Sequence, residues 1–136
     1  MSVLQSLQFV RLISKIIHAP RWSAAKIERV QRKRLHDLVR YAVEHSALYR
    51  EKYRGIDLNH LELSQLPTTD KLELSAHFEE TITDPRIRRE DVEQFVADPA
   101  NLGRWYLGSY AVSHTSGSQG TPMMILQDRR ALEIFF

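Results

Sequence analysis

Apolar and polar residues alternate at helical spacing over the first part of the chain. Between residues 4 and 17, leucine or isoleucine at positions 4, 7, 12, 13, 16 and 17 are interrupted by glutamine, arginine and lysine. This spacing predicts an amphipathic helix that ends before Pro20. The interrupting polar residues are not the pattern of a signal peptide or a membrane-spanning helix. A helix packed on its own protein and a helix on a membrane surface both remain open.

A second amphipathic pattern begins after Ser23, which is a suitable N-cap, and runs to Gly55 with a break near Ser46. Its predicted inner stripe contains Ile27, Val30, Leu35, Leu38, Val39, Ala42 and Val43. Basic residues dominate the stretch 11–40, with nine Lys or Arg against Glu28 and Asp37. Acidic residues return in later turns and no aromatic residues are interleaved to stack on bases. We therefore interpret the charges as a solvated helix face and predict no nucleic-acid partner.

Residues 55–102 read as short helical turns joined by polar connectors. Thr69 or Asp70 is predicted to cap one of these turns. The apolar residues expected to face inward from it are Leu72, Leu74 and Phe78. Two Asp-Pro steps, Asp84–Pro85 and Asp98–Pro99, predict element boundaries.

Strand character begins only after Gly103. Aromatic and β-branched residues predict one strand over 105–112, and the apolar run at 123–126 predicts a second. Asp128 is expected to cap a final helix, whose apolar end at Phe136 is expected to be a cut rather than a finished end. The predicted fold class is α+β, with a mostly helical part at 1–102 and a strand–loop–strand–helix unit at 103–136. All of 1–136 would belong to one domain.

Composition narrows the function classes. The chain has 136 residues, 43% of them hydrophobic and 26% charged, which is typical of one globular domain. The absence of cysteine excludes disulfides, thiolate metal ligands and a cysteine nucleophile, and it fits a cytoplasmic location. Formal net charge is +2, too small to require a polyanionic partner. No two histidines lie three or four residues apart, so no metal site is predicted.

The stretch "SHTSGSQGTPMM" at 113–124 concentrates glycine and hydroxyl residues. Gly117 and Gly120 permit backbone conformations in which successive N–H groups face one concavity, and neighbouring hydroxyls add donors suited to phosphate oxygens. No Lys follows Gly120 as a Walker loop requires, and neither G-x-G-x-x-G nor G-x-S-x-G is present. The residue types alone therefore fit either an anion site or a flexible hairpin loop.

The order Thr115-Ser116-Gly117-Ser118-Gln119-Gly120-Thr121-Pro122 resembles the phosphate-binding signature of adenylate-forming enzymes, T/S-S-G-S/T-T-G-x-P. The segments "LVRYAVEHSALYREKY" and "LPTTDK" are similar to the phenylacetate-CoA ligase-like branch, including relatives linked to capsular polysaccharide biosynthesis. The resemblance covers nearly all 136 residues, although only the loop is a chemical motif. The chain departs from it at Gln119, where many members have Thr, and at Thr121, where many have Lys.

This resemblance implies a larger α/β adenylate-forming fold and a reaction in which ATP and Mg²⁺ convert a small carboxylate into an acyl-adenylate. Coenzyme A is the acceptor in many members. The residues implied to hold the nucleotide phosphates are Thr115, Ser116, Gly117, Ser118, Gln119, Gly120 and Thr121. The adenine and acyl pockets, the acidic metal-binding motif and the catalytic lysine are expected in the remainder of the enzyme, so no catalytic residue is assigned here and this chain alone is expected to be inactive.

Some residues near the loop can be interpreted in two ways. His114 suits contact with nucleotide or substrate, or a structural hydrogen bond, and Trp105 and Tyr106 suit an acyl pocket or the core. A second function class also stays open: a small helical interaction module, bound to a membrane surface or a polyanion, in which the loop only connects two strands.

Overall fold

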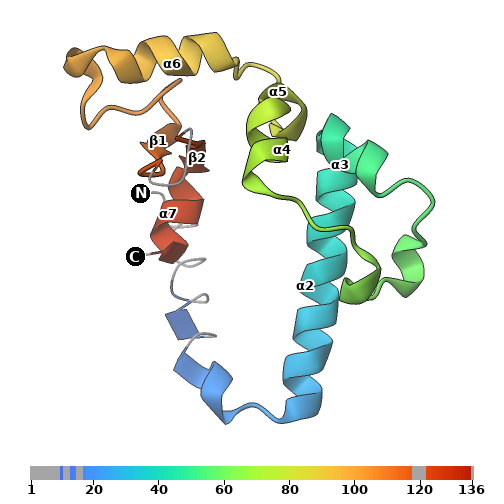
Figure 1. Ribbon diagram of the computed structural model, residues 1–136. Helices are drawn as coiled ribbons and strands as arrows, with labels where there is room; N and C mark the ends of the chain where they lie inside the picture. The colour runs from blue at the N-terminus through green and yellow to red at the C-terminus, as the bar shows by residue number, and fades with distance from the viewer. Residues whose placement is uncertain (1–9, 11–12, 15–16, 118–121, 136) are drawn as a thin grey trace.

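The computed structural model describes residues 10, 13, 14, 17–117 and 122–135 (Figure 1). Most of the helix expected before Pro20 therefore lies outside the described residues. The described residues among 10–18 have helical backbone, and a 3₁₀ turn, η1 (Ala19–Arg21), follows. The α-helical backbone of the described residues ends at His18, so the predicted end before Pro20 is confirmed. Pro20 lies at the start of the 3₁₀ turn that follows, where its missing N–H would have no partner.

Two helices follow, α2 (Ala24–His45) and α3 (Ala47–Lys52). The Ser23 side chain accepts a hydrogen bond from the Lys26 backbone N–H at 3.3 Å, as expected of an N-cap. Ser46 separates the two helices and caps the second. Gly55 then has a φ of 82°, which glycine adopts without steric cost. The predicted start, break and end of this helical stretch are confirmed.

The inner stripe of α2 is narrower than its sequence pattern predicts. Val39 is buried and Leu35 is half-buried, but Leu38 is 66% exposed and Ile27 is also exposed. Leu38 and Val39 lie about 100° apart around the helix. Because α2 is contacted along one side by α3 and by the turn η2 (Leu58–His60), the inward placement predicted for Leu38 is wrong.

Short elements fill the next segment: η3 (Leu63–Gln65), α4 (Lys71–Ala76) and α5 (Phe78–Thr81). Asp70 caps α4 by accepting from the Glu73 N–H at 2.8 Å, as predicted. Phe78 is buried and Leu74 half-buried, whereas Leu72 is 77% exposed. The prediction for Leu72 is wrong, because two residues separated by two positions project to nearly opposite sides of a helix.

After Asp84–Pro85 the chain enters α6 (Arg89–Ala97), and Asp98–Pro99 begins the turn η4 (Pro99–Asn101). Both Asp-Pro steps therefore mark boundaries as predicted. Figure 1 shows α6 running from the α4–α5 pair toward the C-terminal hairpin. The helix thus connects the mainly helical part of the chain to its strands.

The hairpin consists of β1 (Tyr110–His114) and β2 (Met124–Asp128), paired antiparallel with His114 opposite Met124. The predicted first strand starts too early, because Leu107 and Gly108 have positive φ and form a turn before Tyr110. Asp128 accepts from the Ala131 N–H at 2.7 Å and begins α7 (Arg129–Phe135), as predicted. The strand–loop–strand–helix order is confirmed.

The hydrophobic core lies where the hairpin packs against α5, α6 and the residues between these two helices. Its buried residues are Phe78, Ile87, Val92 and Tyr106. One face of the hairpin packs against them through alternate residues of each strand, namely Tyr110, Val112, Met124 and Leu126. This alternation is the two-residue period of a strand with one buried face. As a whole, the described residues are mainly helical, and they include a two-stranded sheet near the C-terminal end.

None of the helices that the structure describes is sufficiently long and apolar to traverse a bilayer.

Candidate functional site

The glycine-rich loop leaves the sheet through a hydrogen-bonded neck. The Thr115 backbone N–H donates to the Met123 carbonyl at 3.0 Å, and the Met123 N–H donates back to the Thr115 hydroxyl oxygen at 2.9 Å. These two bonds continue the ladder one step beyond His114 and Met124. Thr115 and Met123 are therefore held side by side at the two ends of the glycine-rich segment.

The structure describes the first three residues of the candidate phosphate site. Thr115 is half-buried and Ser116 is exposed. Gly117 has a φ of 66°, in the left-handed region that favours glycine. Ser118, Gln119, Gly120 and Thr121 lie outside the described residues, so their contribution to the site stays a prediction.

Thr115 also has a structural role, which was not predicted from the sequence. Its N–H and one acceptor position of its hydroxyl are used in the neck. The hydroxyl hydrogen is the donor that Thr115 can still offer to a ligand, because a threonine hydroxyl has one donor besides its acceptor lone pairs.

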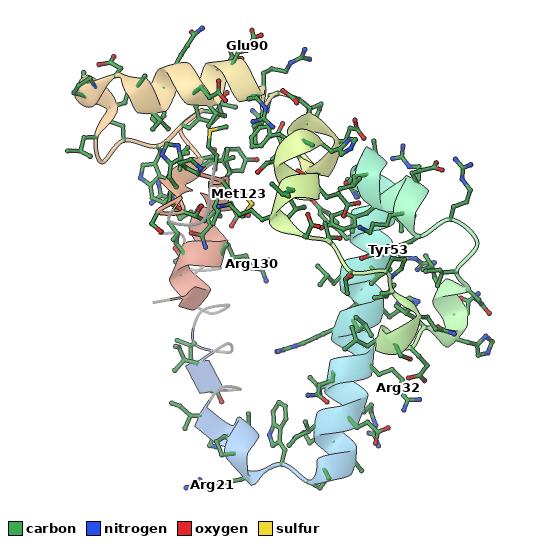
Figure 2. All side chains as sticks on the ribbon, viewed as in Figure 1. Arg21, Arg32, Tyr53, Glu90, Met123 and Arg130 are labelled. Carbon is green, nitrogen blue, oxygen red and sulfur yellow. The ribbon has the colours of Figure 1, made fainter. Side chains whose placement is uncertain are left out.

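A pocket of about 360 Å³ lies beside the loop, between the hairpin, the α4–α5 pair and the start of α6. His114 and Pro122, which flank the loop, contribute to its wall. Met123 faces this space from the hairpin (Figure 2). The remaining wall is mostly apolar, with the guanidinium of Arg89 and the carboxylate of Glu93 among its charged groups.

The two aromatic residues before β1 have different environments. Tyr106 is buried and meets the Phe95 ring edge-to-face at a centroid distance of 5.3 Å, which fits the core interpretation. Trp105 is half-buried, and the central carbon of the Arg129 guanidinium lies 4.3 Å from the centre of its ring. It also lines a second hollow of about 470 Å³, together with Phe95 and Leu102.

A polar contact centred on Asp84, here called the Asp84 anchor, holds β1 against the linker before α6. The sequence did not predict it. The Tyr110 hydroxyl donates to an Asp84 carboxylate oxygen at 2.7 Å, and Arg86 binds the same carboxylate through its guanidinium at 2.6 Å. The hydrogen bonds from Arg86 and Tyr110 hold the pKa of Asp84 below its ordinary value. The bond to Asp84, followed by burial, raises the pKa of Tyr110. The Asp-Pro-Arg sequence that begins at Asp84 indicates a turn, but it does not indicate that the Asp84 carboxylate has a partner 26 residues away.

The histidines do not gather into a centre. Among the residues that the structure describes, no three His, Cys, Asp or Glu side chains are placed to hold a metal ion together. His60 and His77 pair locally with Asp57 and Glu80. His114 is exposed at the pocket beside the loop.

Comparison with protein-family models, curated proteins and solved structures found no match to this chain.

Proposed function

We propose that this chain is the phosphate-binding N-terminal part of an ATP-dependent adenylate-forming ligase. In this proposal the enzyme activates a small carboxylate as an acyl-adenylate and passes the acyl group to an acceptor such as coenzyme A. The larger α/β adenylate-forming fold and a cytoplasmic location belong to the same proposal. The observation that carries it is the sequence at 115–122, placed at the end of a hydrogen-bonded hairpin.

The donor chemistry of the loop supports a phosphate ligand. Hydroxyl groups and backbone N–H groups beside a left-handed glycine can converge on phosphate oxygens. The neck between Thr115 and Met123 fixes both ends of the loop, which lowers the entropy cost of ordering it around a ligand. Mg²⁺ would arrive on the nucleotide and neutralise charge on its phosphates, since it is usually held by phosphate oxygens and water as well as by protein ligands.

The chemical role proposed for the loop is electrostatic. As the carboxylate attacks the α-phosphorus, negative charge shifts onto the departing pyrophosphate. Donors already directed at the β- and γ-phosphates stabilise that charge without reorganising. In this chain the donors at Ser116, Ser118 and Thr121 are hydroxyls, and the lysine that many family members have at the last of these positions is replaced by Thr121.

An ATP titration of the ¹⁵N-labelled chain tests the proposal. We expect saturable shifts of the amide signals of residues 115–121 in the presence of Mg²⁺, because those N–H groups lie in or beside the loop. Adenosine, which carries the base and ribose without phosphates, is the matched control and is expected to leave the same signals unchanged.

Two outcomes would count against the proposal. Equal shifts with adenosine would show that the loop does not recognise phosphate. Shifts on α2 with an unmoved loop would favour the interaction-module class, in which a polyanion binds the basic residues of that helix.

A further inference from the structure

The pocket beside the loop is lined mainly by apolar side chains, and the described residues of its wall include the charged pair Arg89 and Glu93. Its apolar lining comes from α4, α5 and the loop end of the hairpin, through Leu74, Phe78, Ile82, Met123, Met124 and Leu126. Its volume of about 360 Å³ falls within the usual range for small-molecule pockets, about 300–1,000 Å³. Of the described residues next to the loop, His114 and Pro122 line this pocket, and Thr115, Ser116 and Gly117 do not.

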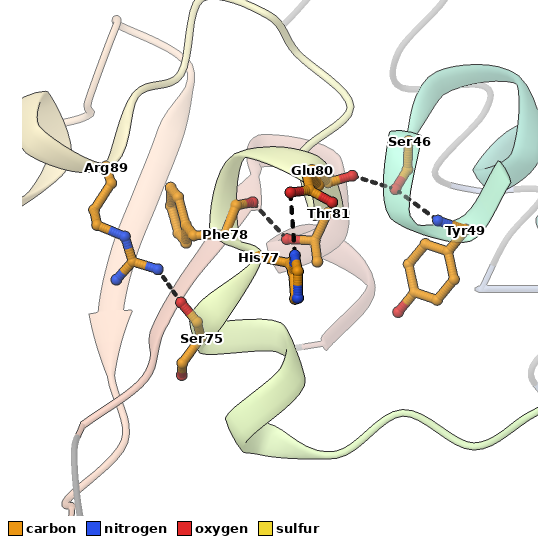
Figure 3. Close-up of polar contacts among 8 residues, drawn as sticks. All are labelled: Ser46, Tyr49, Ser75, His77, Phe78, Glu80, Thr81 and Arg89. Atoms are coloured by element: carbon orange, nitrogen blue, oxygen red, sulfur yellow. Dashed lines mark hydrogen bonds and ion pairs between the residues drawn. The ribbon is translucent and has the colours of Figure 1, made fainter. Parts of the chain in front are cut away.

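Arg89 is held in a fixed orientation at this pocket. Its guanidinium donates to the Ser75 carbonyl, and its central carbon lies 5.0 Å from the centre of the Phe78 ring (Figure 3). The side chain is 33% exposed. A planar guanidinium that is already oriented loses little further freedom when it binds an anion.

Two carboxylates lie near Arg89: that of Glu79 accepts from its backbone N–H at 3.0 Å, and that of Glu93 lies beside its guanidinium. The nearest carboxylate oxygen, on Glu93, is 3.8 Å from a guanidinium nitrogen, and Glu93 is 56% exposed. That distance exceeds a hydrogen bond, which for charged groups is about 2.7–2.9 Å. Arg89 therefore retains donors that a closer anion can use.

We propose that this pocket binds an amphipathic monoanion, meaning a molecule with one anionic head and one apolar tail. The head pairs with Arg89, and the tail lies against Phe78 and the two methionines. A neutral apolar ligand would leave the Arg89 charge unmatched, and a multiply charged head would be repelled by Glu93. The inference does not depend on the function proposed for the loop.

The methionines provide direct reporters. The chain contains three methionines, and Met123 and Met124 line the pocket. We would label the methionine methyl groups with ¹³C and titrate the chain with octanoate or octyl sulfate, without ATP. Both are expected to shift the Met123 and Met124 signals saturably. Octanol, with the same tail and no charge, is expected to bind at least about tenfold more weakly, the scale of one charge-assisted hydrogen bond.

Two substitutions are expected to change the affinity for octanoate in opposite directions. Arg89→Met should weaken octanoate binding about tenfold, because it removes the cation and keeps the apolar stem. Glu93→Gln should strengthen binding about twofold to threefold, because it removes the competing negative charge. If Arg89 and Glu93 acted only as a structural pair, both substitutions would change binding in the same direction. Arg89→Lys keeps the charge and serves as the fold control, with thermal unfolding measured for every variant.

The proposal is overturned by equal affinities for octanoate and octanol, by the absence of saturable methyl shifts, or by changes of the same sign in the Arg89 and Glu93 variants. Methyl shifts that follow protein concentration and not ligand would assign the pocket to a second copy of the chain and would also overturn it. Because ATP is absent throughout, a loop that failed to bind phosphate would leave these readings unchanged.

Discussion

At the scale of single residues, Asp84 connects parts of the chain that are distant in sequence. Its carboxylate is 16% exposed and accepts hydrogen bonds from Arg86 and from the Tyr110 hydroxyl. Both bonds favour the ionised carboxylate, and the second also keeps the proton on Tyr110. The first residue of β1 is thereby attached to the linker that precedes α6.

The lowered pKa of Asp84 predicts a loss of stability in acid. Its pKa in the fold lies below the ordinary value of about 3.9, so the unfolded chain takes up the proton first as the pH falls. The stabilisation is full above about pH 4 and declines progressively below it. Asp84→Asn should therefore lose less unfolding free energy than the native chain between about pH 5 and pH 3. Urea unfolding measures this, and an identical pH dependence for the two chains would contradict it.

Some residue environments could not be predicted from the sequence. Leu38 and Leu72 are apolar residues in helices with an inner face, yet both are exposed. Their exposure depends on which side of a helix a neighbour covers, and that is a property of the tertiary arrangement. The bond between Asp84 and Tyr110 was equally hidden, because nothing local to either residue specifies a partner 26 positions away.

At the scale of elements, the helix boundaries were predictable because caps act locally. Ser23, Ser46, Asp70 and Asp128 each accept a hydrogen bond from a backbone N–H three residues later. The start of β1 was not predictable, since strand-forming residues at 105–107 are overridden by the turn at Leu107 and Gly108. The position of the glycine-rich loop between two strands was predictable, because glycine and proline interrupt two apolar runs.

Ser46 joins two elements as well as capping one. Its side chain is fully buried, donates to the Glu80 carbonyl at 2.6 Å and accepts from the Tyr49 N–H at 3.4 Å (Figure 3). Ser46→Ala should reduce the free energy of unfolding by about 2 kcal/mol, because it removes a cap and leaves a carbonyl without its partner. Ser23→Ala removes an exposed cap and should cost less, about 0.5–1 kcal/mol. Chemical denaturation compares them, and equal losses would contradict the linking role of Ser46.

At the scale of the whole molecule, the helical part acts as a support for the hairpin. The core around Phe78 and Val92 packs on one face of the sheet, and the Asp84 anchor fixes the start of β1. The neck at Thr115 and Met123 then presents the glycine-rich loop beyond the end of the sheet. In our account this arrangement fixes the direction from which a triphosphate approaches. The pocket with Arg89 adjoins the loop at His114 and Pro122.

The central claim is that the loop holds phosphate, and two glycines test it most directly. Gly117 in the loop and Gly108 in the turn before β1 have nearly equal positive φ values, 66° and 69°. Valine at either position should introduce comparable backbone strain, about 1–2 kcal/mol. The measurement is the Mg-ATP dissociation constant of each folded variant. We predict that Gly117→Val weakens binding at least about tenfold, the scale of one lost charge-assisted bond, while Gly108→Val binds like the native chain. Unchanged affinity for Gly117→Val, or equal weakening by both substitutions, would contradict the claim.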